Sequence, residues 1–485
     1  MTEGSALFTD FYELTMAQGF WKRNMDRRSV FEMFFRRQPF NSGFAIFAGL
    51  ESFLEKLKIF RFADSHLEYL DSLGVFEKPF LRYLQDFRFS GDVWAVDEGT
   101  IVFPQEPLIR IDAGLIEAQL IEGMLLNTVN FQSLVATKAA RVWLASDKGS
   151  VMEFGLRRAQ GPDGAMSATR AAYIGGASGT SNTLAGARFG IPVMGTMAHS
   201  WVMSFPSELE AFDAYAEIYP DRTIFLIDTY DTLESGIGHA IEAGARLAAK
   251  GKNFGVRLDS GDIHYLSVKV RKALDDAGFP KATIAVSNDL DEAIIETLSA
   301  AGAPIDSWGV GTRMVTGGEE AAFTGVYKLT ARGNGDGGLV PVMKFSDNPE
   351  KTTNPALKQT WRIHDEAGMA VADVLALADP DSADGAEVLQ VGQDHAFWHP
   401  AVDYRHFHYV PLIEPVALLK PCMRSGALLA PHPGLPEIRA RVSDGLESFD
   451  GSYKRLLNPH VYRVAITDRL KDLKLGLIKE YLGER

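Results

Sequence analysis

Residues 195–200 hold the side chain of greatest chemical interest, because His199 stands there among very small residues. A glycine-rich run at residues 175–182 precedes it, and a basic run with Arg157 lies further upstream. An imidazole titrates near neutral pH and can act as an acid, a base or a nucleophile. Small residues leave backbone amides open to an anion, and a guanidinium binds phosphate as a planar fork. These stretches predict phosphate chemistry around a reactive histidine, with an ordinary core or surface histidine as the alternative.

Arg257 is a charged residue inside an otherwise apolar strand run at residues 254–258. A buried arginine needs an anionic partner. One interpretation is an internal ion pair with Asp228 or Asp259, and the other is a fork that binds a substrate carboxylate. Asp259 and Asp262 are also suited to ribose hydroxyls or a hydrated Mg²⁺, with capping of the next helix as the alternative.

A second glycine turn, at residues 309–312 with Gly317 and Gly318 behind it, follows a later strand run. Taken alone such a turn is weak evidence of a site, since flexible glycine turns are common. Two glycine turns at strand ends strengthen each other, because late strand loops are a frequent phosphate site in barrels.

The middle of the chain alternates short β-branched or aromatic runs with segments of helical period, and polar residues end each run. Four of these runs end at residues 228, 259, 288 and 312. Successive ends are separated by about the length of one βα unit. Earlier runs at 151–154 and 191–194 fit the series. Consecutive βα units specify a parallel sheet with its site at the carboxyl ends of the strands. We expect an irregular TIM-like α/β barrel, because no dinucleotide fingerprint follows the first strand.

The flanking segments have a different pattern. We expect strands within 29–35 and 91–113, and helices within 8–23, 47–60, 116–145, 432–455 and 466–483. The 485 residues exceed the roughly 250–300 at which one core stops growing, so we expect two or three domains. The predicted parts are an N-terminal α+β domain over 1–115 that other segments complete, the barrel with the active site over 116–330, and a C-terminal region over 331–485 that packs on both.

Hydrophobic residues make up 46% of the chain, and 63 acidic against 49 basic residues give a net charge of −14. This balance argues against nucleic acid or an anionic membrane as a partner. The single cysteine, Cys422, excludes internal disulfides and a cysteine-based zinc cage. Neither a signal-peptide pattern nor an apolar run of the ~18–20 residues that cross a bilayer is present. We therefore expect a soluble, cytoplasmic protein without a metal held by its own side chains.

Six motifs, in chain order, resemble those of the nicotinate phosphoribosyltransferase family: residues 9–16, 153–161, 179–182, 195–200, 257–262 and 309–312. The resemblance implies an irregular barrel of the type II phosphoribosyltransferases, a discontinuous N-terminal domain and a C-terminal extension. It also implies a homodimer in which the neighbour's N-terminal residues complete the site. The implied reaction converts nicotinate, phosphoribosyl pyrophosphate, ATP and water to nicotinate mononucleotide, pyrophosphate, ADP and phosphate, with Mg²⁺, in NAD biosynthesis.

The resemblance also implies roles for individual residues. His199 matches the histidine that ATP phosphorylates transiently. Tyr12 matches the ring that stacks on nicotinate, whereas by its position alone it is a core aromatic of the first helix. The remaining substrate-binding positions are Thr196 and Arg257 toward nicotinate, Thr312 toward phosphoribosyl pyrophosphate, Arg157 toward pyrophosphate or nicotinate, and Ser200, Asp259 and Gly311. Some relatives carry glutamate where this chain has Ser200.

Three alternatives differ in what they must bind. A nicotinamide phosphoribosyltransferase would recognise a neutral amide, for which a guanidinium in the base pocket is poorly suited. A quinolinate-using relative would bind a second carboxylate and would need no ATP. A non-catalytic paralogue that binds pyridine nucleotides would not need His199, Arg257 and Thr312 together, and all three are present.

Overall fold

The computed structural model describes residues 5–348, 351–378, 387–402 and 404–483. The chain forms two compact units. Unit 1 consists of Met1–Leu134 and Ala322–Arg485, and unit 2 consists of Val135–Ala321. Unit 1 is therefore built from both ends of the sequence, whereas unit 2 is one continuous segment.

Unit 2 contains a parallel sheet of six strands in the order β7-β6-β11-β10-β9-β8. The strands are β6 (Ser150–Glu153), β7 (Gly179–Thr180), β8 (Ile224–Leu226), β9 (Gly255–Leu258), β10 (Thr283–Val286) and β11 (Ser307–Val310). Because every pairing is parallel, the carboxyl ends of all these strands lie at one edge. The side chains that follow the strands are thereby gathered at that edge.

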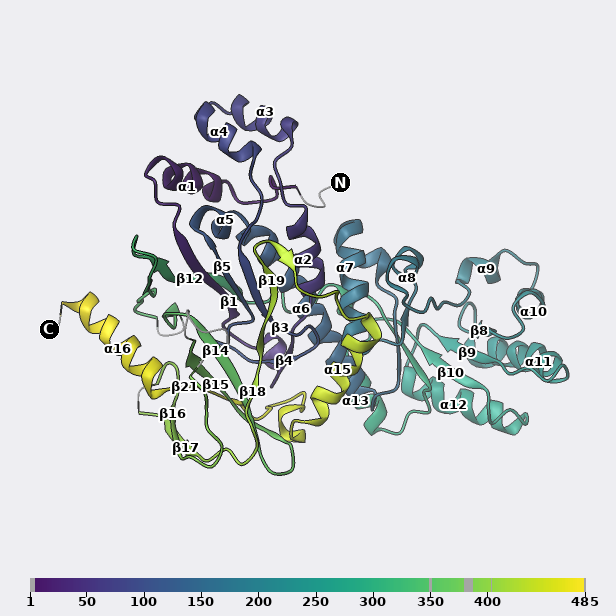
Figure 1. The fold of residues 1–485 in the computed structure, drawn as a ribbon. Coiled ribbons are helices and arrows are strands. Elements are labelled where there is room, and N and C mark those ends of the chain that lie inside the picture. The colour runs from purple at the N-terminus through teal and green to yellow at the C-terminus, as the bar shows by residue number, and fades with distance from the viewer. Residues whose placement is uncertain (1–4, 349–350, 379–386, 403, 484–485) are drawn as a thin grey trace. The chain divides into compact units, whose positions relative to one another are not determined.

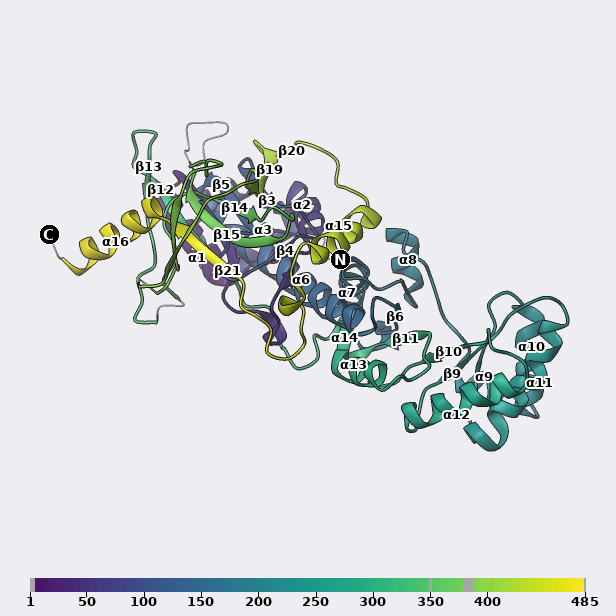
Figure 2. The same cartoon turned by 90° about the horizontal axis from the view of Figure 1, so that it is seen from below.

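Helices alternate with these strands along the chain, and α10, α11 and α12 lie around strands β8, β9 and β10 (Figures 1 and 2). They are α7 (Gly161–Ile174), α8 (Thr183–Phe189), α9 (His199–Met203), α10 (Glu208–Ile218), α11 (Ile237–Ala248), α12 (Ile263–Asp276), α13 (Glu292–Ala300) and α14 (Thr312–Val315). Aspartates cap helices that follow strands: Asp262 accepts from the Tyr265 amide at 2.9 Å, and Asp291 from the Ile294 amide at 3.0 Å. The capping interpretation of Asp262 is therefore confirmed.

The mixed α/β class is confirmed, but a closed barrel is not. The edge strands β7 and β8 are not paired with each other in the sheet that the described residues form. The run predicted as a strand at 191–194 contributes an isolated bridge, between Val193 and Thr180. The βα spacing thus predicted the parallel order correctly, whereas closure depends on edge pairing that spacing does not specify.

Unit 1 contains two larger sheets and a short two-stranded one. The first, of seven strands in the order β13-β12-β1-β5-β3-β19-β20, is antiparallel throughout. Its strands are β1 (Arg28–Phe35), β3 (Asp92–Val96), β5 (Ile109–Gly114), β12 (Gly325–Gly333), β13 (Leu339–Pro341), β19 (Leu419–Arg424) and β20 (Ala427–Leu428). The N-terminal strands are thus completed on both sides by strands from beyond residue 322.

The second large sheet of unit 1 comes entirely from the C-terminal part, in the order β17-β16-β21-β15-β14-β18. Its strands are β14 (Lys358–His364), β15 (Ala370–Leu377), β16 (His395–Trp398), β17 (His406–Tyr409), β18 (Val416–Ala417) and β21 (Arg463–Thr467), and the short sheet joins β2 (Ala45–Ile46) to β4 (Ile101–Val102). The residues after 340 therefore form a sheet with its own buried cluster around Phe397.

The helices of unit 1 are α1 (Phe11–Lys22), α2 (Leu50–Lys58), α3 (Asp64–Ser72), α4 (Lys78–Gln85), α5 (Leu115–Leu120), α6 (Glu122–Ala145, which continues into unit 2), α15 (Leu435–Glu447) and α16 (Asp468–Leu482). Each predicted flanking helix is present in unit 1, although the stretch at 116–145 is divided into α5 and α6, and α3 and α4 were not predicted. Aromatic side chains such as Phe47, Phe53 and Phe80 fill the core that the helices share with the antiparallel sheet. Within the described part of the chain, no helix combines the length and apolar character needed to span a membrane.

Candidate active site

His199 begins helix α9 in unit 2, and its side chain is half-exposed. Its Nδ1 lies 3.2 Å from the hydroxyl oxygen of Thr229, which follows strand β8. Its Nε2 lies 3.7 Å from a carboxylate oxygen of Asp259, which follows β9. One ring nitrogen is therefore held by Thr229, and the other lies beside the Asp259 carboxylate. Both contacts are at the edge of the sheet where its strands end.

Asp228 and Asp259 are linked to each other at adjacent strand ends. One carboxylate oxygen of Asp228 accepts from the Asp259 amide at 2.8 Å and from the Ser260 hydroxyl at 2.6 Å. Its other oxygen is buried and has no hydrogen-bond partner among the residues that the structure describes. Asp259 in turn accepts a hydrogen bond from the Ser287 hydroxyl at the end of β10. The strand ends thus form one polar network with an acceptor that is unsatisfied within the chain.

Arg257 and Thr196 contact each other, as the predicted shared subsite requires. An Arg257 Nη1–H donates to the Thr196 hydroxyl, while the Arg257 Nε is buried without a partner. Burial lowers the pKa of Arg257, opposed by Asp259 and Asp228 and reinforced by the nearby charge of Arg157. Neither aspartate forms a direct ion pair with Arg257 among the described contacts. Arg257 therefore keeps guanidinium donors available for an anion.

The glycine turn at 309–312 lies against the turn that follows strand β6 in unit 2. Gly311 ends strand β11 and is the N-cap of α14, whose first residue is Thr312. A Cβ placed on Gly311 would lie 3.1 Å from the Phe154 carbonyl oxygen, so the turn after β11 lies against the turn after β6. That second turn carries Arg157, which is exposed. The structure brings both turns together, leaving an exposed cation and an exposed hydroxyl beside small residues.

Ser200 and Tyr12 form none of the strand-end contacts described above. Ser200 is the exposed second residue of α9, and its carbonyl accepts from the Ser204 hydroxyl at 2.6 Å. Tyr12 belongs to unit 1, in the first turn of α1, with 47% of its side chain exposed. Burial and the nearby carboxylates of Glu122 and Glu13 raise the pKa of Tyr12 to about 12. Its ring is therefore a neutral, accessible surface rather than the core aromatic that its position alone suggested.

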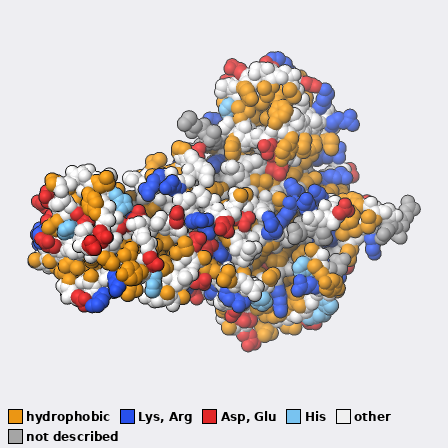
Figure 3. Space-filling view, turned by 180° about the vertical axis from the view of Figure 1, so that it is seen from behind, with side chains coloured by type: hydrophobic (Ala, Val, Ile, Leu, Met, Phe, Trp, Pro, Cys, Tyr) orange, Lys and Arg blue, Asp and Glu red, His pale blue; other side chains and the backbone are white. Residues whose placement is uncertain are grey.

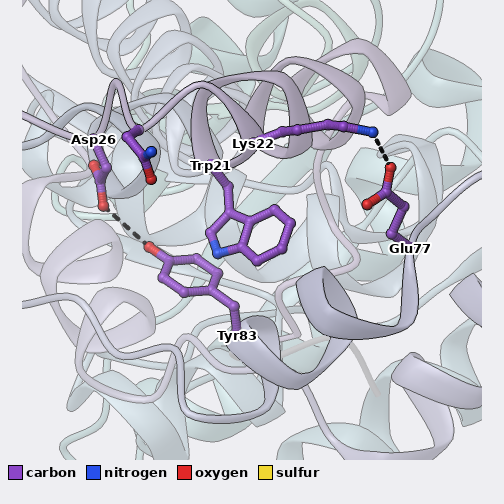
Figure 4. A pocket seen from close by; sticks show the side chains of 6 residues that line it. Trp21, Lys22, Asp26, Glu77 and Tyr83 are labelled. Carbon is purple, nitrogen blue, oxygen red and sulfur yellow. Dashed lines mark hydrogen bonds and ion pairs between the residues drawn. The ribbon is translucent and has the colours of Figure 1, made fainter.

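A shallow pocket of about 510 Å³ lies on unit 1, and no predicted site residue lines it (Figure 4). Lys22 reaches Glu77, and the Tyr83 hydroxyl donates to Asp26 at 3.2 Å across from the indole of Trp21. Burial and Asp26 raise the pKa of Tyr83. Since its lysine is already paired with Glu77 and Asp26 adds a negative charge, this pocket is poorly suited to an anion.

Two contacting residues were not singled out from the sequence. Thr229 orients His199, and Ser287 donates to Asp259. Both follow predicted strands, so the polar strand ends were the available signal. Among the residues that the structure describes, no three His, Cys, Asp or Glu side chains cluster as a metal site would require.

The fold is that of an α/β protein in which polar side chains, among them His199, Arg257 and Asp259, gather at the carboxyl ends of a parallel sheet. Family models described as the N-terminal domain, the family and the C-terminal domain of nicotinate phosphoribosyltransferase match residues 7–130, 150–367 and 357–474. A nicotinate phosphoribosyltransferase of Bacillus subtilis is 42% identical over 478 residues, covering 98% of this chain and 95% of the relative. The human protein of that name is 34% identical over 526 residues, covering 96% and 95%.

Solved structures also resemble this chain in their fold. The crystal structure of human nicotinic acid phosphoribosyltransferase matches with a TM-score of 0.84 and 31% identity, covering 97% of this chain and 99% of that one. A nicotinate-nucleotide pyrophosphorylase of Pyrococcus furiosus shares the fold, with a TM-score of 0.68 and 22% identity. The chain belongs to the nicotinate phosphoribosyltransferase family.

Proposed function

We propose that this protein transfers a phosphoribosyl group from phosphoribosyl pyrophosphate to nicotinate, coupled to ATP hydrolysis through phosphorylation of His199. The observation that carries the proposal is the single strand-end network containing His199, Thr229 and Asp259 in a member of this family. The product would be nicotinate mononucleotide, so the enzyme would act as an ATP-dependent ligase of NAD biosynthesis in the cytoplasm. We also propose that the open sheet of unit 2 is one side of an irregular barrel.

Arg257 and Thr196 would bind the nicotinate carboxylate. The guanidinium is partly buried, and its buried Nε has no partner in the described part of the chain. A carboxylate can accept two parallel N–H bonds from a guanidinium, which satisfies such a donor and offsets its burial. The Thr196 hydroxyl holds the fork in place by accepting from Nη1. A neutral amide would leave the guanidinium charge uncompensated, so the geometry favours the acid over nicotinamide.

The glycine turns with Arg157 and Thr312 would bind the phosphates of the ribosyl donor. Departure of pyrophosphate from ribose C1 leaves oxocarbenium character, and the pyridine nitrogen then attacks C1 without a protein nucleophile. Catalysis of this kind rests on positioned cations and amides. Mg²⁺ would neutralise the leaving pyrophosphate, and the unsatisfied oxygen of Asp228 with Asp259 offers the hard oxygen donors that it prefers.

His199 would couple the ATP reaction. With Nδ1–H donating to the Thr229 hydroxyl, the Nε2 lone pair is free to attack the γ-phosphorus of ATP. The bond from that phosphorus to its bridging oxygen breaks, releasing ADP. Water then cleaves the phosphoramidate, giving phosphate and restoring the imidazole. Thr229 orients the ring and thereby selects the nitrogen that reacts.

We further propose a homodimer in which Tyr12 of one copy stacks on nicotinate bound to the other. The observation behind this step is that the Tyr12 ring is half-exposed, beside exposed Phe8, Phe11 and Met16. An exposed apolar group of this kind is typical of an interaction surface. Light scattering gives the state in solution, and a monomer with full activity would exclude the shared site.

The decisive experiment is a mass assay for nicotinate mononucleotide with and without ATP. We expect product from nicotinate, stimulation by ATP, and little product from nicotinamide. His199→Ala should abolish ATP hydrolysis coupled to synthesis, because no other imidazole replaces it in the network. His264→Ala is the matched control, since His264 is a half-exposed histidine of the same unit whose Nε2 lies 3.4 Å from the Ala301 carbonyl oxygen, outside the strand-end network. Unchanged ATP-coupled turnover in His199→Ala would remove this residue from the mechanism.

A further inference from the structure

Four buried polar residues of unit 2 form a closed hydrogen-bonded ring. Thr169 and Thr180 donate their hydroxyls to Glu153 Oε2 at 2.9 and 2.6 Å. Asn182 donates its side-chain amide to the Thr169 hydroxyl oxygen at 3.2 Å and its backbone amide to that of Thr180 at 2.9 Å. Each of the four residues is at most 2% exposed. The ring is therefore fully inside the protein and internally satisfied.

Glu153 connects segments that are separate in sequence. It ends β6, between β7 and β11 in the sheet, and its Oε1 accepts from the Gly155 amide. Thr169 lies on α7, Thr180 on β7, and Asn182 caps α8 through the Ala185 amide at 3.2 Å. One carboxylate thus holds the start of the Arg157 turn, the glycine turn at 179–182 and helix α7.

The position of the Arg157 turn depends on this anchor. A Cβ on Gly155 would overlap the Val315 side chain of α14, so the turn is seated tightly against the helix that carries Thr312. Displacement of Gly155 would therefore shift the arginine turn and the second glycine turn together. Binding of one ligand by preformed turns avoids the entropy cost of ordering them at each encounter.

A carboxylate is suited to this task because it only accepts hydrogen bonds and can take several at once. An amide in its place would direct N–H groups toward the hydroxyls of Thr169 and Thr180. The two hydroxyl hydrogens would then lose the acceptor that Oε2 gives them, and turning the amide over would instead set its N–H groups against the N–H of Gly155. Burying a carboxylate is costly, and this cost is offset only when its hydrogen bonds are complete.

We propose that Glu153 is a positioning residue that fixes the Arg157 turn and the glycine turn at 179–182 as one preformed site for the pyrophosphate of the ribosyl donor. It acts through these turns and does not itself touch the substrate, because its side chain is buried. The inference rests on the proposed function, since it assigns the ligand of these turns as a diphosphate.

The test compares Glu153→Gln, Thr180→Val and Thr180→Ser in the full chain. Thr180→Val keeps the shape but removes the hydroxyl, and Thr180→Ser restores it. We expect the first two to raise KM for phosphoribosyl pyrophosphate about tenfold or more, as loss of a hydrogen bond to a charged group does. KM for nicotinate should stay within about twofold, because Arg257 is not part of the ring. Thr180→Ser should recover wild-type values.

Glu208→Gln controls for the loss of any buried carboxylate in unit 2, since Glu208 pairs with His239 at 2.8 Å outside these turns. Calorimetric titration with pyrophosphate, alongside the melting temperature, separates binding from folding. Equal rises in both KM values, a Thr180→Ser variant no better than Thr180→Val, or a lower melting temperature with unchanged pyrophosphate binding would overturn the role. Absence of product in the wild type would instead refute the proposed function, so the two failures are distinguishable.

Discussion

Arg257 is a partly buried cation that forms no direct ion pair among the described contacts. Burial lowers its pKa, Asp259 and Asp228 act on it from a distance, and its Nε has no partner. A protein that used Arg257 only for stability would pair it directly, since an uncompensated buried charge is destabilising. In the proposed carboxylate subsite, Arg257 would therefore contribute binding energy at some cost in stability.

Arg257→Lys should raise KM for nicotinate by about tenfold to hundredfold, the range expected when charge-assisted hydrogen bonds are lost. Lysine keeps the positive charge but lacks the planar fork. Steady-state kinetics with nicotinate and with nicotinamide measure the effect, and the preference for the acid should shrink. Arg246→Lys is the control, because Arg246 is an exposed arginine that pairs with Asp213 and Glu242. A KM for nicotinate that moved equally in both variants would contradict the carboxylate subsite.

Glu13 makes the stability of unit 1 depend on pH. Burial, with the charges of Glu122 and Asp10, raises its pKa to about 8 from an ordinary value of 4.5. Between these values the unfolded chain has released a proton that the folded chain retains. Stability therefore falls as pH rises through this window, by about 1.4 kcal/mol per unit of raised pKa, and levels off above it.

Glu13→Gln removes the titrating group, so its unfolding free energy should decline less than that of the wild type between about pH 5 and about pH 8. The variant should also be the more stable protein at the upper end. Urea denaturation at both pH values measures this, with Glu55→Gln as the exposed control for carboxylate-to-amide exchange. Parallel curves for Glu13→Gln and the wild type would show that Glu13 ionises freely.

The individual side chains at the strand ends were predictable, but their contacts were not. His199, Arg257 and Asp259 stood out because polar residues follow apolar strand runs. The bond from His199 to Thr229 joins residues on different strand loops, and no spacing rule specifies which loops meet. The exposure of Tyr12 was likewise unpredictable, because a tyrosine on a helix fits core and surface equally well.

At the scale of elements, close approach of helix α11 to strand β8 positions the end of that strand. Gly236 is the N-cap of α11, and a Cβ there would overlap the Ile227 carbonyl oxygen just before Asp228. Its φ of −56° is ordinary, so only the missing space forbids a side chain. The glycine thus lets the helix pack directly against the backbone that carries Asp228 and Thr229.

Gly236→Ala should destabilise the protein by about 1–3 kcal/mol, the usual cost of overpacking, and reduce turnover by displacing Asp228. Gly238→Ala provides a matched comparison two residues along the same helix, where a Cβ would meet nothing within 4 Å. That variant should gain up to about 1 kcal/mol from helix propensity. Thermal unfolding and kinetics of the two proteins decide the matter, and equal stabilities would refute the packing argument.

Helices and strands were predicted well where the hydrophobic periodicity of the sequence is strong. They were predicted poorly where a strand exists only because it pairs with a neighbouring strand. The run at 282–286 and the helix at 466–483 emerged close to β10 and α16. The glycine turn at 179–182 instead contains the two-residue strand β7, which exists because Gly179 and Thr180 pair with Met152 and Glu153. Such a strand has no propensity signal, since its stability comes from its neighbour.

At the scale of the whole molecule, long-range pairing builds unit 1. β1 pairs with β12, some 300 residues later, and β3 pairs with β19. Local sequence predicts that these strands exist but not that they share a sheet, because loop length limits pairing only weakly. On the face drawn in Figure 3, acidic and basic side chains are interspersed, so the net charge of −14 does not form one uniform acidic surface there.

The ion pair between Glu32 on β1 and Lys358 on β14 joins the N-terminal and C-terminal segments of unit 1. The groups are 2.7 Å apart and at most 3% exposed, and the ammonium also donates to the carbonyls of Asn354, Pro355 and Ala356. Burial lowers the pKa of Lys358 against the opposing effect of Glu32. Both charges have lost their water, so each depends on the other.

Lys358→Met should therefore cost about 3–5 kcal/mol, because it leaves Glu32 charged and buried without its cation. Adding Glu32→Gln to that variant removes the stranded charge while keeping an acceptor for the backbone amide of residue 358. The double variant should accordingly be more stable than Lys358→Met alone, as measured by denaturant unfolding at constant pH. If the second substitution instead added a further loss, the two residues would contribute independently. Each residue would then stabilise unit 1 through its own backbone hydrogen bonds, and the attraction between the two charges would contribute nothing further.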